Sequence, residues 1–300
     1  MVKLAPEVKA ALVAGKPVVA LESSVLAQGL PTPHNAAAAE RMVDAVRAAG
    51  AVPAITGVVR GQAVAGMAPD ELSRFLRGEG ITKASARDLG AAMAGQRDAA
   101  TTVASALLIC HVARIPVFAT GGIGGVHRSP AFDESADLIE LARTPVMVVC
   151  AGAKSVLDLP ATVERLETLG ITVVGYRTSE FPGFHYASTG IPVPARFDEV
   201  GDIVEVFRAQ RALGHPAAVV VVQGPPADAA LPRDEVESAI DAALTSAREA
   251  GVRGSAMTPY LLGELARRTQ GRTIDVNLAL LEANARLAAE LSVRLAGVDS

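Results

Sequence analysis

The fold class of this chain is decided by residues 145–176, PVMVVCAGAKSVLDLPATVERLETLGITVVGY. The stretch contains an apolar run at Val146–Cys150, a helix-like segment at Ser155–Leu169 and a second apolar run at Ile171–Tyr176. Short apolar runs that alternate with helices of this length are typical of layered α/β folds, in which helices cover both faces of a sheet. The stretch therefore predicts a strand, a helix and a second strand.

The same alternation continues along the rest of the chain. Further strands are predicted at Pro17–Leu21, Val52–Val59, Ile115–Ala119 and Ala217–Val222. Helices are predicted within residues 1–17 and at Asn35–Ala49, Ala99–Ala113, Asp133–Arg143, Asp202–Leu213, Arg233–Ala250, Pro259–Gln270 and Ile274–Leu295. No linker or internal repeat is visible, so we expect residues 1–300 to form a single layered α/β/α domain with a central mixed sheet.

Composition and charge argue against several classes of protein. The net charge is −4 and only 3% of the residues are aromatic, which argues against a nucleic-acid polymer as partner. Cys110 and Cys150 lie in apolar runs without metal-ligand spacing, which indicates a reducing compartment. Neither a signal peptide nor an apolar stretch of membrane-spanning length is visible, so we expect a cytoplasmic protein without membrane contact.

Lysine is scarce, and its distribution points to a reactive amine. Beyond residue 16 only Lys83 and Lys154 remain, although arginine is common throughout. Arginine stays protonated, whereas a buried lysine can lose its proton and add to a carbonyl to form a Schiff base. Lys154 follows the apolar run Val146–Cys150, which makes it a candidate for this chemistry. A lysine that only flanks the start of a helix is the alternative.

Two carboxylate positions are candidates for catalysis or metal binding. Glu22 directly follows the run that ends at Leu21, where partial desolvation would raise its pKa and suit a general acid. Asp133, Glu134 and Asp137 open the segment FDESADLIELA, where a hard cation such as magnesium or manganese could be held. At both places a carboxylate that only caps a helix or turn is the alternative.

A glycine-rich turn, TGGIGG at residues 120–125, follows the predicted strand Ile115–Ala119. Glycine amides can approach an anion closely, and His127 and Arg128 add donors that suit a phosphate. Lys83 could add a point charge to the same phosphate, although a solvent-facing lysine is the simpler reading. A tight turn without a ligand is the alternative for the glycines. The irregular segment Thr178–Asp198 is either functional or a plain surface excursion.

Six motifs occur in an order that resembles one known family. They are ALESSVLAQGLPTPHN, TKASARDL, ATTVAS, FATGGIGGVHR, FDESADL and VVCAGAKSVLDL. Their order is similar to that in the pseudouridine-5′-phosphate glycosidases, which are also called indigoidine synthase A-like proteins. The resemblance extends from about residue 5 to about residue 295.

The resemblance implies a chemistry and a set of site residues. It implies reversible cleavage of the C–C glycosidic bond of pseudouridine 5′-phosphate to uracil and ribose 5-phosphate by a manganese-dependent homotrimer. Lys154 would form an imine with ribose C1′, Glu22 would donate the proton and Asp133 would hold the metal. The other positions matched to the substrate are Lys83, Val103, Ser135, Ala136, Asp137, Thr120, His127 and Asn277, with Thr120 and His127 near the phosphate.

The chain departs from the family pattern at three positions, which are Gly224, Ala283 and Ala86. The family usually has asparagine at the first two and arginine at the third, so fine substrate preference stays open. Two other functions also stay open. One is a Schiff-base lyase or aldolase that acts on another sugar phosphate or C-nucleotide, and the other is a non-catalytic nucleotide-binding trimer.

Overall fold

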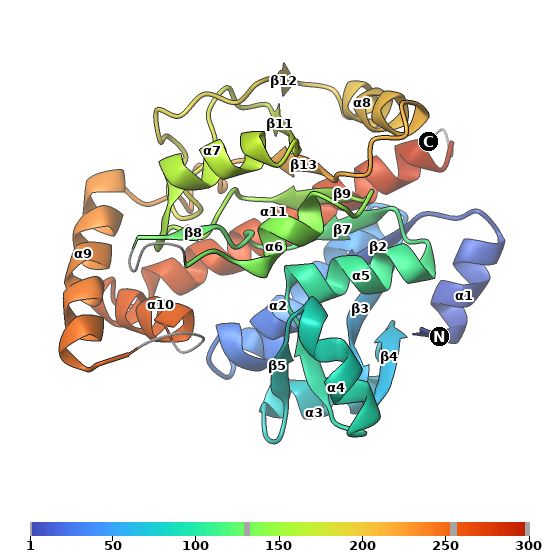
Figure 1. Ribbon diagram of the computed structural model, residues 1–300, viewed down its shortest axis with the longest axis horizontal. Coiled ribbons are helices and arrows are strands. Elements are labelled where there is room, and N and C mark those ends of the chain that lie inside the picture. Colours follow the sequence, from blue (N-terminus) through green and yellow to red (C-terminus); the bar gives the residue numbers. More distant parts are fainter. Residues whose placement is uncertain (1, 129–132, 253–256, 298–300) are drawn as a thin grey trace.

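A central mixed sheet organises the chain, as Figure 1 shows. The computed structural model describes residues 2–128, 133–252 and 257–297. In these residues the sheet has eleven strands, in the order β1-β4-β3-β2-β7-β9-β13-β11-β12, with β6 on β3 and β5 on β6. The strands are β1 (Lys3–Leu4), β2 (Val18–Leu21), β3 (Val52–Val59), β4 (Gln62–Ala65), β5 (Thr82–Ala84), β6 (Ala99–Thr101), β7 (Val117–Ala119), β9 (Met147–Cys150), β11 (Thr172–Tyr176), β12 (Arg196–Phe197) and β13 (Val219–Val222). A separate small sheet pairs β8 (Val126–His127) with β10 (Leu157–Asp158).

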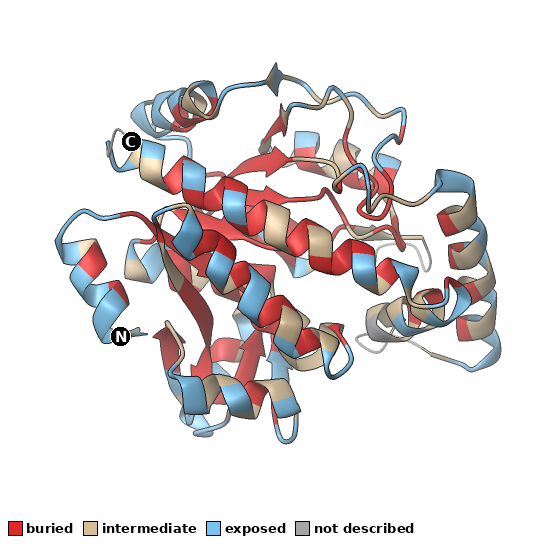
Figure 2. Cartoon of the chain, turned by 180° about the vertical axis from the view of Figure 1, so that it is seen from behind, coloured by how far each residue is buried: buried red, intermediate tan, exposed pale blue. Residues whose placement is uncertain are grey.

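Helices cover both faces of the sheet. They are α1 (Pro6–Val13), the π-helical turn η1 (Val25–Gly29), α2 (His34–Ala48), α3 (Pro69–Arg77), the short 3-10 helix η2 (Ala86–Asp88), α4 (Leu89–Ala94), α5 (Val103–Ala113), α6 (Ala136–Leu141), α7 (Leu159–Thr168), α8 (Val200–Ala212), α9 (Arg233–Glu249), α10 (Met257–Arg268) and α11 (Arg272–Leu295). In Figure 1 helices α5, α6 and α7 lie in front of the sheet. In Figure 2, seen from behind, the long helix α11 and its neighbour α2 cross the opposite face.

The central strands are parallel and buried on both faces. Strands β2, β7, β9 and β13 are neighbours in parallel register, and all of their residues are buried. Their side chains alternate between two apolar clusters, so that Val18 packs on the α5 side and Val19 on the α11 side. Parallel sheets covered on both faces are built from such continuous apolar runs. The predicted mixed α/β sheet with helices on both faces is confirmed.

The structure shortens three predicted helices. The segment Ala99–Ala113 divides into strand β6 and helix α5, because β6 pairs with both β3 and β5. Helix α6 begins only at Ala136, since Ser135 is its N-cap and accepts a hydrogen bond from the Asp137 amide. Helix α7 begins at Leu159, where Asp158 accepts from the Ala161 amide. Lys154 therefore lies in a loop before β10 and does not flank a helix start.

Residues 60–101 contain three strands that the sequence pattern missed, β4, β5 and β6. Strand β3 continues beyond the parallel core, and β4 and β6 pair with this continuation in antiparallel register. Strands β5 and β6 have three residues each, which is too short for a periodic pattern. No helix in the described part of the chain is long and apolar enough to cross a membrane.

Candidate active site

One pocket lies at the edge of the sheet where three parallel strands end. Glu22 follows β2, Gly121 and Gly122 follow β7, and Lys154 follows β9. Because these strands are adjacent and parallel, the loops at their carboxyl ends converge. The pocket is lined by Glu22, Ser24, Val25, Gln28, Gly29, Lys83, Gly121, Gly122, Lys154, Phe184, Thr258, Leu262 and Asn277. The predicted residues Glu22, Lys83, Lys154 and Asn277 are thus brought together.

Glu22 has the environment of a proton donor. Its side chain is buried, Thr120 Oγ1 donates to Oε1 at 2.9 Å and Ser24 Oγ donates to Oε2 at 3.3 Å. Burial raises the pKa of the Glu22 carboxyl, while the positive charge of Lys154 and the Thr120 hydrogen bond offset part of this effect. The carboxyl therefore keeps its proton to a higher pH than an exposed glutamic acid does.

The two lysines interact electrostatically in this pocket. Lys154 is partly buried, and Lys83 reaches the pocket from strand β5. Lys83 is exposed as a residue, but partial burial of its amine among protein atoms lowers its pKa. The positive charge of Lys154 lowers the pKa of Lys83 further, whereas the Glu22 and Asp137 carboxylates oppose the shift. Two amines in one pocket provide a site for an anionic group.

The loop that carries Lys154 is joined to the glycine-rich loop by backbone hydrogen bonds. The Lys154 amide donates to the Ile123 carbonyl at 3.1 Å, and the Ile123 amide donates to the Gly152 carbonyl at 3.0 Å. Gly152 has φ +79°, and a Cβ there would lie 2.3 Å from the Pro182 carbonyl oxygen, so only glycine fits. These contacts hold the backbone of Lys154 in place. The amide of Ile123 is therefore occupied within the protein and is not free for an anion.

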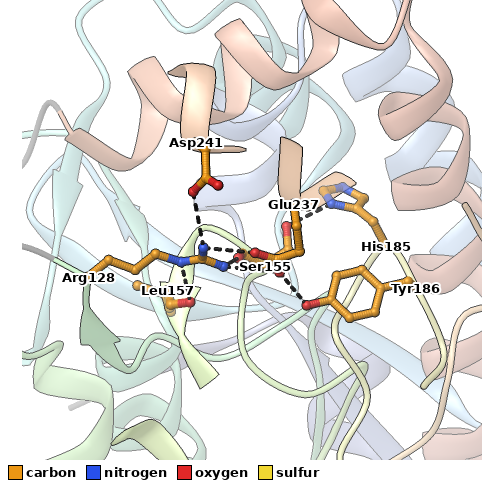
Figure 3. Close-up of polar contacts among 7 residues, drawn as sticks. All are labelled: Arg128, Ser155, Leu157, His185, Tyr186, Glu237 and Asp241. Atoms are coloured by element: carbon orange, nitrogen blue, oxygen red, sulfur yellow. Dashed lines mark hydrogen bonds and ion pairs between the residues drawn. The ribbon is translucent and has the colours of Figure 1, made fainter. Parts of the chain in front are cut away.

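The Arg128 side chain lies in a cluster of polar contacts with Ser155, Leu157 and Glu237, as Figure 3 shows. Its guanidinium forms a double hydrogen bond with the Glu237 carboxylate, at 2.8 and 3.1 Å. It also donates to the carbonyls of Ser155 and Leu157. Tyr186 donates to the same carboxylate at 2.6 Å. Arg128 thus ties the residues that follow Lys154 to helix α9.

A second contact anchors the residue next to Lys154. Ser155 Oγ and His185 Nδ1 lie 2.8 Å apart in the interior (Figure 3). Burial lowers the pKa of His185 to about 3, so the ring is neutral at physiological pH. A neutral ring has one bare nitrogen. The Ser155 hydroxyl can therefore donate to Nδ1 while the other ring nitrogen faces the backbone of Thr273.

Helix α11 contributes Asn277 to the pocket and Asn284 to a neighbouring hydrogen-bond chain. Asn277 lines the pocket, and its Oδ1 is buried without a hydrogen-bond partner among the described residues. Asn284 donates to the Thr120 carbonyl at 2.8 Å and accepts from Gln223 at 2.9 Å. The family departures at Gly224 and Ala283 therefore adjoin a hydrogen-bond chain that supports the glycine-rich loop.

Several predicted substrate residues form a structural group beside the pocket. Asp137 is buried and accepts from the Ala104 amide at 2.9 Å and the Gly124 amide at 2.8 Å, so it joins helix α5 to the glycine-rich loop. Ser135 caps helix α6, which starts at Ala136. The Val103 side chain lies in the core, so a ligand could reach only its backbone. None of these residues is among those that line the described pocket.

Asp133 and His127 form a separate pair. The ring Nδ1 of His127 lies 3.4 Å from the Asp133 carboxylate and 3.1 Å from the Asp133 carbonyl. The Asp133 side chain is 36% exposed, so solvent can reach it. The residues described in the structure contain no cluster of three or more potential metal ligands. A carboxylate open to water fits an ion that keeps several waters in its coordination shell.

Two features of the site were not predicted from the sequence. A buried hydroxyl network joins Thr101 to Ser23 and Thr56, with Thr56 and Thr101 Oγ1 at 2.8 Å. It ties the segment after Glu22 to strand β6, which pairs with the strand that carries Lys83. Gln28 was also missed as a site residue, although it lies in the first of the quoted motifs.

Comparison with known protein families shows which family the chain belongs to. A family model described as indigoidine synthase A like protein matches residues 7–294. The chain belongs to this family. A relative from Gemmatimonas aurantiaca named pseudouridine-5′-phosphate glycosidase is 59% identical over 285 residues, which cover 95% of this chain and 93% of the relative. A relative of the same name from Chloroflexus aurantiacus is 49% identical, with 98% of this chain and 99% of the relative covered.

Two solved structures of the indigoidine synthase A-like fold are similar over nearly the full length. The prealnumycin C-glycosynthase AlnA, solved with ribulose 5-phosphate, has a TM-score of 0.92 and 38% identity, with 99% of this chain and 98% of that chain covered. An indigoidine synthase A-like protein from Thermotoga maritima has a TM-score of 0.91 and 35% identity, with 99% and 97% covered. These similarities support the assignment of the fold and of the family.

Proposed function

We propose that this protein is a pseudouridine-5′-phosphate glycosidase, which cleaves its substrate reversibly to uracil and ribose 5-phosphate. The observation that carries the proposal is the buried carboxyl of Glu22, whose pKa is raised, in the same pocket as Lys154. The names of the Gemmatimonas and Chloroflexus relatives support the substrate. A C–C bond has no leaving oxygen that an acid could protonate, so two carboxylates, as in ordinary glycosidases, would not suffice.

A lysine and a carboxylic acid can together break such a bond. The free Lys154 amine displaces O4′ from C1′ of the ribose, and a proton passes from the nitrogen to O4′, which leaves an open-chain secondary amine with the base attached and a free 4′-hydroxyl. Glu22 then transfers its proton to C5 of uracil. The C1′–C5 bond breaks as the nitrogen lone pair forms the C=N bond of the imine. Water hydrolyses this imine to ribose 5-phosphate and releases the amine.

Lys83 is the residue that we assign to the phosphate. It lines the pocket from the opposite part of the sheet, and it lies close enough to Lys154 for their charges to interact. A bound phosphate dianion would stabilise the charged form of Lys83, which desolvation disfavours in the free enzyme. The phosphate is remote from the breaking bond, so its binding energy can hold the sugar in a reactive geometry. Thr120 would act indirectly in this site, because its hydroxyl donates to Glu22.

Manganese is part of the proposal. The exposed carboxylate of Asp133, with His127 beside it, would hold the ion together with water ligands. The ion would supply positive charge for an anionic or hydroxyl group of the substrate. Homotrimeric assembly and a cytoplasmic location also belong to the proposal, and the sequence resemblance is their support.

The test is a uracil-release assay on pseudouridine 5′-phosphate, with and without manganese, combined with borohydride trapping of ribose 5-phosphate. The proposal expects uracil release and a trapped sugar adduct. Trapping without uracil release would favour a Schiff-base lyase for another sugar phosphate. The absence of both would favour a non-catalytic binding protein, and either result would overturn the proposed function.

A further inference from the structure

Gln28 lines the pocket and carries an unused hydrogen-bond acceptor. The residue lies in the π-helical turn η1, six positions after Glu22, and lines the same pocket as Glu22 and Lys154. Its Nε2 donates to the Ile81 carbonyl at 3.0 Å. Its Oε1 is buried and has no hydrogen-bond partner among the described residues. An acceptor left in this state costs about 1–3 kcal/mol unless a ligand satisfies it.

The orientation of this carboxamide follows from its chemistry. A carbonyl oxygen can only accept, so the group that faces the Ile81 carbonyl must be the amide nitrogen of Gln28. The amide oxygen is then held on the other side of the carboxamide. Strand β5 begins directly after Ile81, so the Nε2 hydrogen bond also braces Gln28 against the strand that carries Lys83.

The base of the proposed substrate supplies groups that match this acceptor. In pseudouridine the sugar is attached at C5, so the uracil ring keeps both of its N–H groups. Both lie on the side of the ring that faces away from C5. When C5 is turned toward Glu22 and Lys154, these N–H groups point to the opposite wall and need acceptors there. The phosphate has no such donor, and an amide oxygen next to it would be repelled.

We propose that Gln28 recognises the uracil ring by accepting a hydrogen bond from one of its N–H groups. This proposal rests on the proposed function. It makes Gln28 a residue that binds and orients the base, separate from the amine and acid that act on the bond. Asn277 Oδ1, which is also buried without a partner in the described residues, is available to the other N–H group.

The test measures synthesis from uracil and ribose 5-phosphate in a Gln28→Met variant. Methionine is similar in length and cannot accept this hydrogen bond. We expect KM for uracil to rise about tenfold, which corresponds to about 1.4 kcal/mol. Two measurements on the sugar should change less than about twofold, because a substitution away from the sugar contacts has only small effects there. They are KM for ribose 5-phosphate and the fraction of enzyme trapped by borohydride with ribose 5-phosphate alone. The control is Gln62→Met, the same substitution at an exposed position in β4.

Three outcomes would overturn the role of Gln28. One is an unchanged KM for uracil in Gln28→Met. The second is a parallel loss of sugar trapping, because Gln28 would then act on the sugar or through Ile81 on strand β5. The third needs no variant: if 1-methyluracil and 3-methyluracil both bind the wild-type enzyme as well as uracil does, no acceptor reads the N–H groups. If the wild-type enzyme does not turn over uracil at all, the proposed function fails and this proposal falls with it.

Discussion

At the scale of single residues, the site combines an amine and an acid whose environments differ. Glu22 is shielded from water and holds its proton, whereas Lys154 is only partly buried and keeps access to the pocket. Titratable groups with shifted pKa values cluster at functional sites because acid and base chemistry require them. Glu22 and Lys83 have shifts in opposite directions, and both arise mainly from desolvation.

Lys154→Arg is expected to keep the fold and to lose turnover by several orders of magnitude, because arginine cannot supply a free amine. Uracil release measures the loss. In the wild-type enzyme, mass spectrometry after borohydride treatment should place the sugar adduct on Lys154. An adduct on Lys83 would transfer the nucleophile role to that residue, and near-normal activity of Lys154→Arg would exclude the imine mechanism.

Glu22→Gln is expected to stop uracil release while ribose 5-phosphate is still trapped on Lys154, since only the proton transfer to C5 is lost. The variant should also change the pH dependence of stability. The pKa of Glu22 is raised in the folded state, so the stability that its proton contributes is full below the unfolded pKa and is lost as pH rises through the folded pKa.

Glutamine carries no such proton, so the melting temperature of Glu22→Gln should exceed that of the wild type increasingly as pH rises. Thermal unfolding of both proteins from acid to alkaline pH measures this difference. A difference that stays constant with pH would show that the carboxyl is not held in its protonated form by the fold.

Asp133→Asn is expected to abolish the activation by manganese. The structure gives the N-cap of helix α6 to Ser135, so the helix-cap alternative does not apply to Asp133. In the wild type, a chelator should remove activity and manganese should restore it. Manganese binding can be followed directly by electron paramagnetic resonance. The matched control is Glu134→Gln, because the Glu134 carboxylate pairs with Arg165 at 2.9 Å and is not assigned to the metal. A wild-type manganese response in Asp133→Asn would rule out the metal assignment.

At the scale of elements, the loop after β9 is held from two sides. Its backbone pairs with the loop after β7, and Arg128 ties the residues beyond Lys154 to helix α9. Burial alone would raise the pKa of Glu237, but the hydrogen bonds from Arg128 and Tyr186 outweigh it and hold the pKa below its usual value. The folded state therefore stabilises the charged carboxylate, and this stability is lost as pH falls through the lowered pKa.

Glu237→Gln is expected to lower the free energy of unfolding by about 1–3 kcal/mol, the cost of leaving a half-buried charged donor without its partner. Turnover should also fall, because the Lys154 loop loses one of its supports. The control is Asp241→Asn on the same helix, at 3.9 Å from Arg128 with a side chain that is 76% exposed. Exposed pairs of this kind contribute little, so the control should stay close to wild type in chemical denaturation. Equal effects of the two variants would contradict a supporting role of the Arg128–Glu237 pair.

At the scale of the whole molecule, the pocket is assembled from distant parts of the chain. Strand β5 provides Lys83, the parallel core provides Glu22 and Lys154, and helix α11 provides Asn277. A ligand that contacts all of them ties the antiparallel extension of the sheet to its parallel core. Binding to the folded state alone stabilises the whole fold by mass action.

Ribose 5-phosphate is therefore expected to raise the melting temperature of the wild-type protein, with a stabilisation of about 2.7 kcal/mol at a concentration one hundred times Kd. Lys83→Met should weaken this binding by about 1.5–3 kcal/mol, the scale for a hydrogen bond to a charged group. Thermal unfolding at increasing ligand concentration measures both. The nucleoside without phosphate should bind the wild type and Lys83→Met equally, and a difference between them would remove Lys83 from the phosphate site.

The sequence by itself determined the layered α/β class and most of the core elements. The runs that became β2, β7, β9 and β13 are apolar throughout, and a strand with both faces covered by helices has this pattern in any context. The same local pattern identified Glu22, which stands directly after such a strand, and Lys154, which lies in the loop that follows one.

Only the tertiary structure decided which of the candidate residues share a pocket. Lys83 and Asn277 come from elements far from Glu22 in sequence, and strand order and helix packing bring them together. Arg128 looked like a phosphate donor beside the glycines, yet its partner Glu237 lies 109 positions further along the chain. Nothing in the sequence near Gln28 shows that its Nε2 donates to the Ile81 carbonyl and that its Oε1 has no partner among the described residues. The hydrophobic pattern of a sequence indicates which residues of a single helix or strand are buried. Ion pairs and hydrogen-bond acceptors without a partner depend on contacts between different helices and strands, which the pattern does not contain.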